Sequence, residues 1–135
     1  MHRAIFALAL FATLPVTAAL AQEVAPMDLD SIDPDLLESF YGPWQIRNEN
    51  GDKLCKVVLK KETTIGGTQI EIDPACAKTF PIMGEITAWR LKENWTIELV
   101  DALRKTRITF ETPDDNYIAE PETDGIFTIE QLAGD

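Results

Sequence analysis

The stretch "WQIRNENGDKLCKVVLK", residues 44–60, contains the clearest strand pattern of the chain. Its first part alternates, with Trp44 and Ile46 followed in turn by the polar residues Gln45 and Arg47. Asn-Gly-Asp follows at 50–52, a sequence typical of turns between antiparallel strands. The segment "KLCKVVLK" then resumes the pattern. The stretch therefore predicts a β-hairpin with one apolar face directed towards a core.

Similar short segments continue from this hairpin to the C-terminus. They are separated by turn sequences such as Gly66-Gly67, "KEN" at 92–94 and "PDDN" at 113–116. Short alternating strands at this spacing are typical of an antiparallel sandwich or an up-and-down barrel. The predicted strands are 44–49, 53–60, 68–73, 84–91, 95–100, 106–111, 117–120 and 126–132.

Eight strands of this kind close a barrel whose interior side chains can just fill. Bulky residues are available for that interior: Phe40, Trp44, Phe80, Trp89, Trp95, Phe110 and Phe127. The alternative is that Trp89 and Trp95 line a pocket for a ligand. The sequence leaves both interpretations open and favours a filled core.

One short helix is predicted before the hairpin, over residues 33–41. Asp33 can cap it, Pro34 suits its first position, and Gly42-Pro43 ends it. Because the segment spans only about two turns, it needs a surface to pack on.

The first residues resemble a secretory signal peptide. Arg3 precedes an apolar run at 5–14, Pro15 breaks the run, and small residues lead to Ala21. A membrane anchor is the alternative, but a span needs about 20 apolar residues. We expect cleavage after Ala21, no membrane insertion after that cleavage, and location in the periplasm or outside the cell.

The expected organisation is a signal peptide at 1–21, an extended N-terminal arm at 22–32, and a β-barrel domain at 33–135. The chain has a net charge of −11, and losing the single Arg of residues 1–21 brings it to −12. Nucleic acid is an unsuitable partner, because binding phosphates requires a basic surface. The charge fits either solubility of an exported protein or attraction to a cationic or metal-bearing partner.

Cys55 and Cys76 are the only cysteines. In an exported chain they are expected to form a disulfide. The alternative is a catalytic thiol, which needs a base. His2 is the only histidine, and it would be lost with the signal peptide. The sequence therefore favours the disulfide.

Motifs for catalysis or metal binding are lacking. Without histidine the expected mature chain lacks the commonest general base, and neither Ser31 nor Ser39 has a suitable partner. The Asp114-Asp115-Asn116 run lacks the spacing of a calcium loop and is interpreted as a solvated turn. We therefore predict no enzymatic activity, no catalytic residues, no metal site and no cofactor.

Several local sequences, in this order, resemble the AprI/Inh family of secreted bacterial inhibitors of serralysin-type zinc metalloproteases. They are "DLLESFYGPW", "GDKLCKVVL", "IEIDPAC", "ITAWRL", "WTIELVDA" and "ITFE". The resemblance covers about residues 34–135. It implies a compact, lipocalin-like eight-stranded barrel with one disulfide, a serralysin-type protease as partner, and a monomer.

The resemblance also implies roles for individual residues. The family's structural positions correspond here to Gly42, Trp44, Cys55, Cys76 and Trp89. An N-terminal trunk enters the protease cleft towards the catalytic zinc. By location alone, the arm that would do so comprises Gln22, Glu23, Val24, Ala25, Pro26, Met27 and Asp28.

Other functions on the same scaffold remain open. A carrier of small hydrophobic ligands would need an open apolar cavity. An envelope adaptor would use the barrel as a scaffold for a stable protein partner. The arm itself is alternatively a plain exported tail.

Overall fold

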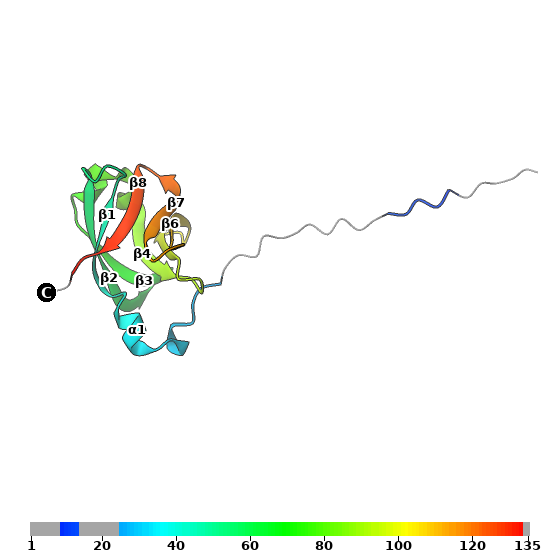
Figure 1. Ribbon diagram of the computed structural model, residues 1–135, viewed down its shortest axis with the longest axis horizontal. Helices are drawn as coiled ribbons and strands as arrows, with labels where there is room; N and C mark the ends of the chain where they lie inside the picture. Colours follow the sequence, from blue (N-terminus) through cyan, green and yellow to red (C-terminus); the bar gives the residue numbers. More distant parts are fainter. Residues whose placement is uncertain (1–8, 14–24, 134–135) are drawn as a thin grey trace, which may run out of the picture.

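The hairpin predicted from residues 44–60 is present. In the computed structural model, which describes residues 9–13 and 25–133, β1 (Gly42–Arg47) pairs antiparallel with β2 (Leu54–Thr64), with Trp44 opposite Val57. Each strand pairs with the next along the chain, and β8 (Ile126–Gln131) returns to β1. The eight strands of the described residues thus close into a barrel (Figure 1). The predicted up-and-down barrel is confirmed.

The remaining strands run in chain order around the barrel and join β2 to β8. They are β3 (Gly67–Ile72), β4 (Ile86–Leu91), β5 (Ile97–Asp101), β6 (Thr106–Glu111) and β7 (Tyr117–Thr123). Short helices precede and interrupt them: η1 (Leu29–Ser31), α1 (Pro34–Glu38), α2 (Cys76–Thr79) and η2 (Pro81–Glu85).

The barrel interior is filled by the inward side chains of these strands. Trp89 is 1% exposed, and its indole N–H donates to the Lys60 carbonyl oxygen at 3.0 Å. Phe110 of β6 and Phe80, between α2 and η2, belong to the same buried cluster, as predicted. Phe127 is only half-buried and lies outside the core, because Ile126, Thr128 and Ile129 take the buried positions of β8.

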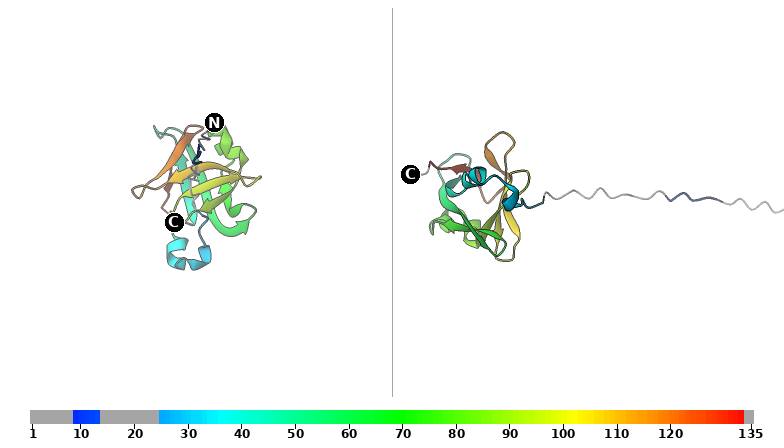
Figure 2. Two further views of the ribbon diagram at one scale, coloured as in Figure 1. Left: turned by 90° about the vertical axis from the view of Figure 1, so that its right-hand side faces the viewer. Right: turned by 90° about the horizontal axis from the view of Figure 1, so that it is seen from below.

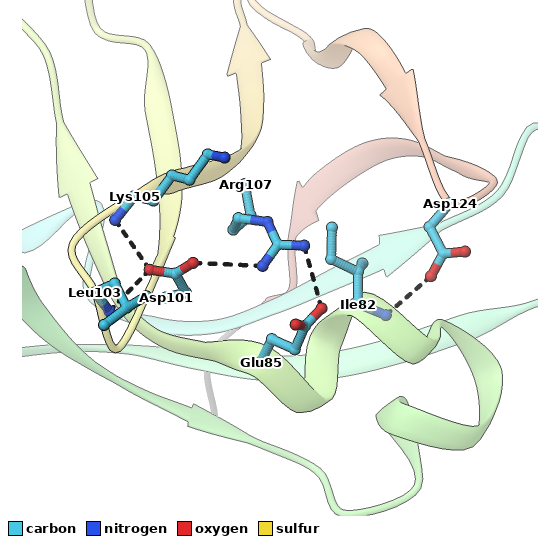
Figure 3. A network of polar contacts seen from close by, with 7 residues as sticks. All are labelled: Ile82, Glu85, Asp101, Leu103, Lys105, Arg107 and Asp124. Atoms are coloured by element: carbon cyan, nitrogen blue, oxygen red, sulfur yellow. Dashed lines mark hydrogen bonds and ion pairs between the residues drawn. The ribbon is translucent and has the colours of Figure 1, made fainter.

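The connection between β3 and β4 differs most from the prediction. It contains α2 and η2, so β4 begins at Ile86 and not at residue 84. Cys55 and Cys76 form the expected disulfide, with an S–S distance of 2.10 Å, and so join β2 to α2. The backbone N–H of Ile82 donates to Asp124 Oδ2 at 2.9 Å, which ties η2 to the β7–β8 turn (Figure 3).

The predicted short helix forms as α1 at one end of the barrel (Figure 1). Asp33 caps it by accepting a hydrogen bond from the Asp35 N–H at 2.9 Å, and Pro34 occupies its first turn. Gly42 follows with φ +114, a conformation that side-chain-bearing residues rarely adopt. The glycine therefore allows the chain to turn from α1 into β1.

A polar network fixes the β5–β6 turn (Figure 3). Asp101 Oδ1 accepts from the backbone N–H groups of Leu103 at 2.9 Å and Lys105 at 3.0 Å. Arg107 donates to Asp101 Oδ2 at 3.3 Å and to Glu85 Oε2 at 3.2 Å. The network thereby joins β5, β6 and η2.

We expect Asp101→Asn to remove a pH-dependent part of the stability. The backbone N–H of Lys105, then that of Leu103 and the Arg107 guanidinium, lower the pKa of Asp101. A carboxylate whose pKa is lowered on folding stabilises the protein above its unfolded pKa of about 3.9. That stabilisation is lost as the pH falls through the lower, folded pKa.

Urea unfolding of both proteins between pH 7 and pH 2.5 measures the effect. The free-energy gap between wild type and Asp101→Asn should be largest near neutral pH and should narrow below about pH 4. Asp114→Asn, in the exposed β6–β7 turn, is the matched control for losing one charge. A gap that stays constant over the whole pH range would contradict the expectation.

Candidate functional site

The N-terminal arm is attached to the barrel from Ala25 onwards. Pro26 forms an antiparallel bridge with Lys92. On either side of the bridge, the Glu93 N–H donates to the Ala25 oxygen at 3.0 Å and the Met27 N–H donates to the Leu91 oxygen at 2.9 Å. Residues 25–27, here termed the anchor, therefore extend the sheet at the end of β4.

The predicted arm residues have different positions. Gln22, Glu23 and Val24 lie outside the described residues. Ala25, Pro26 and Asp28 are exposed, and Met27 is half-buried against the core. Asp28 also caps η1 by accepting from the Asp30 N–H at 3.2 Å. The arm is therefore not extended over its whole predicted length, because residues 29–31 form a helical turn.

The turn that receives the anchor, Leu91–Thr96, has its own internal hydrogen bonds. The Lys92 N–H donates to the Thr96 oxygen at 2.9 Å, and the Trp95 N–H donates to the Lys92 oxygen at 2.8 Å. Trp95 has φ +67, which is uncommon for a bulky residue and requires support from its surroundings. We call residues 91–96 the anchor turn.

That support comes from an aromatic cluster of Phe40, Trp44, Trp95 and Tyr117. The rings of Phe40 and Trp95 stack with centroids 5.5 Å apart, and Trp44 meets Tyr117 edge-on at 5.7 Å. The Tyr117 hydroxyl donates to the Trp95 carbonyl oxygen at 2.8 Å. Burial raises the pKa of Tyr117 to about 12, so this hydroxyl keeps its proton at neutral pH. The cluster thus ties the anchor turn to the barrel and to the end of α1.

Two groups of charged side chains lie near the anchor in the chain or in space. On the barrel, Glu98 is 9% exposed, and its Oε1 lies 3.6 Å from Arg90 Nε and 3.5 Å from Lys92 Nζ, so these opposite charges compensate one another. The segment from η1 to α1 carries exposed carboxylates, namely Asp28, Asp30, Asp33, Asp35 and Glu38. Figure 2, right, shows η1 and α1 across the end of the barrel.

The structure bears on the other chemistry considered from the sequence. In residues 9–13 and 25–133, no group of three or more His, Cys, Asp or Glu side chains is placed to hold a metal ion. No helix in this part of the chain has the length and apolar character needed to cross a bilayer. Trp89 belongs to the packed core, and Trp95 is covered by Phe40, so the two do not line a common ligand pocket.

Nothing in the sequence indicated that the anchor turn pairs with the arm. Residues 92–94 were identified only as a turn between strands. The bridge joins Pro26 to Lys92, positions far apart in the chain, and neither residue type signals such a pairing. The adjacent Pro26 was noted only as part of the arm.

Comparison with known proteins gives one match. The family model described as "Protease inhibitor Inh" matches residues 36–130. The match runs from α1 to β8 and includes the disulfide and the anchor turn, whereas the anchor itself lies ahead of it. Comparisons with curated proteins and with solved structures gave no significant match.

Proposed function

The chain belongs to the Inh family of protease inhibitors, and we propose that its target is a zinc metalloprotease of the serralysin type. In this proposal the peptide ahead of Ala25 enters the active-site cleft and approaches the zinc. The inhibitor acts as a monomer, has no catalytic activity of its own, and is exported to the periplasm or beyond with cleavage of its signal peptide after Ala21. The family match supports inhibition of a protease in general, and the resemblance described above supports the choice of target.

The observation that carries the arm mechanism is the attachment of residues 25–27 to the barrel. A catalytic zinc keeps one coordination position open for water or substrate. A chain end delivered to that position displaces the water. Because no peptide bond continues beyond a chain end, the protease finds nothing to cut there.

Cleavage after Ala21 would leave Gln22, Glu23 and Val24 ahead of the anchor. Three residues span at most about 10 Å when extended, so the anchor must sit close to the cleft. A free N-terminal amine is one candidate zinc ligand. If Gln22 cyclises to pyroglutamate, the ligand becomes a carbonyl oxygen or the Glu23 carboxylate, since zinc accepts oxygen ligands.

Attachment of the arm also contributes to affinity. Ordering a flexible segment on binding costs free energy, and residues that are ordered beforehand avoid that cost. The anchor is held by backbone hydrogen bonds and by the packing of Met27 and Leu29 on the core. The barrel end would supply a second contact area beside the cleft.

The proposal is tested with a panel of proteases and the chain comprising residues 22–135. We expect near-stoichiometric loss of activity for a serralysin-type enzyme and at least about a tenfold weaker effect on a serine protease, which corresponds to about 1.4 kcal/mol. Steady-state rates with a quenched fluorescent peptide measure both. Inhibition of the serine protease alone would refute the proposed target class while leaving the family assignment intact.

A further inference from the structure

We propose that the anchor turn is a positioning element that sets how far the arm reaches. Inhibition would then depend on the number of residues ahead of Ala25, and would tolerate extra residues between the anchor and α1. This inference rests on the proposed arm mechanism. Three observations support it. The anchor has a defined register on the barrel, and the turn that receives it is rigid. Residues 28–33, which follow the anchor, form no strand pairing with the barrel.

A shift of the anchor by one residue in either direction would be unfavourable. If the arm shifted by one residue so that Ala25 faced Lys92, Pro26 would lie opposite the Leu91 oxygen, where it has no N–H to donate. The opposite shift would bring Met27 to face Lys92. Because side chains alternate between faces, Met27 would then turn away from the core that it now packs against.

The receiving turn is held independently of the arm. Trp95 keeps its φ of +67 while its ring stacks on Phe40 and its carbonyl oxygen accepts the Tyr117 hydroxyl. None of these contacts involves the arm. The backbone groups that pair with the anchor, the Leu91 oxygen and the Glu93 N–H, are therefore presented by a fixed element.

Two insertions of equal size distinguish this inference from the alternative that the arm is a flexible link to the barrel. In a flexible link, the position of the added residues would not matter. A Gly-Ser pair between Val24 and Ala25 lengthens the segment ahead of the anchor. The same pair between Ile32 and Asp33 lengthens the connection behind it and leaves the Asp33 cap of α1 in place. Both variants carry the same added residues, so each is the matched control for the other.

We expect the first insertion to weaken inhibition of the serralysin-type enzyme by at least tenfold, because the chain end is displaced from its position. The second should change inhibition by less than about threefold, because the anchor re-forms in the same register and the extra residues bulge out. The inference would be overturned if both insertions weakened inhibition equally, or if the first insertion left inhibition unchanged. Melting temperatures of both variants establish that the barrel is folded.

A second measurement is independent of any protease. In the free protein, the amide protons of Met27 and Glu93 should exchange slowly with solvent, since each is hydrogen-bonded across the bridge. In a chain that begins at Pro26, the Glu93 amide loses its acceptor on Ala25 and should exchange at least tenfold faster. Unprotected amides in the full chain would refute the anchor. If protection is found but the inhibitor fails against every zinc protease, the proposed function fails and the anchor stands.

Discussion

Deletion of Gln22, Glu23 and Val24 is expected to weaken inhibition of a serralysin-type protease by at least about 100-fold, or about 2.7 kcal/mol. These residues precede the anchor, and in the proposed mechanism they alone reach the zinc. The shortened chain begins at Ala25 and retains the backbone groups that pair with Leu91 and Glu93. What remains is the contact between the barrel end and the rim of the cleft.

The same deletion should leave the stability of the barrel unchanged. The core side chains, the disulfide and the anchor all lie within residues 25–133. We expect the melting temperature to change by no more than about 2 °C, which for a domain of this size corresponds to less than about 0.5 kcal/mol. Inhibition constants and thermal unfolding of the same preparations give both quantities.

A length-matched control separates the chain end from its side chains. Replacing Gln22, Glu23 and Val24 with Gly-Ser-Gly keeps the length ahead of the anchor. If the terminal backbone binds the zinc, this variant should keep more inhibition than the deletion. If the Glu23 carboxylate binds it, the two should lose similar amounts. A deletion that inhibits as well as the full chain would exclude the arm mechanism altogether.

Alternation along the sequence was sufficient to predict most of the barrel, because strands such as β1 and β2 have one face in the core and one face outwards, although β5 is buried along its whole length. Where it failed, the causes lie in the tertiary structure. Residues 84 and 85 were assigned to a strand but belong to η2, which is fixed by the distant Asp124. Phe127 was placed inside, but the β7–β8 pairing shifts register between Ile118 and Thr123, and Ile126 fills the interior in its place.

The Gly66-Gly67 pair was correctly predicted as a turn, but the two glycines are needed for different reasons. Gly66 has φ +89, which is the expected reason for a glycine in a turn. Gly67 begins β3, and a Cβ there would lie 2.4 Å from the Trp89 carbonyl oxygen. This close approach between neighbouring strands depends on tertiary structure and has no signal in the local sequence.

The sequence indicated which segment forms the candidate site, but it did not indicate how that segment pairs with the barrel. The acidic, proline-containing segment ahead of α1 stands out by composition, and the resemblance assigned it to the arm. The pairing of Pro26 with Lys92 did not emerge, because non-local pairing of single residues leaves no periodic pattern. Trp95 was predicted as a strand residue facing the core, whereas its positive φ places it in the turn against Phe40.

Trp89→Ala should have the opposite profile to the arm deletion. The side chain is 1% exposed, and its removal leaves a cavity in the barrel interior and the Lys60 oxygen without its donor. Large-to-small changes of this kind cost about 3–5 kcal/mol, a large part of the 5–15 kcal/mol that stabilises a typical domain. The melting temperature should fall by more than about 12 °C. Trp89→Phe, which keeps most of the volume and loses the N–H, should cost about 1–2 kcal/mol.

Inhibition by Trp89→Ala should nevertheless stay within about threefold of wild type at temperatures where the variant is folded. Trp89 lies in the core, and the anchor is held by the backbone of Leu91 and Glu93. Trp89→Ala would then lower stability without weakening inhibition, and the arm deletion would weaken inhibition without lowering stability. A Trp89→Ala variant with unchanged stability that binds a hydrophobic dye no better than wild type would contradict the packed interior. It would also remove the structural objection to a ligand carrier.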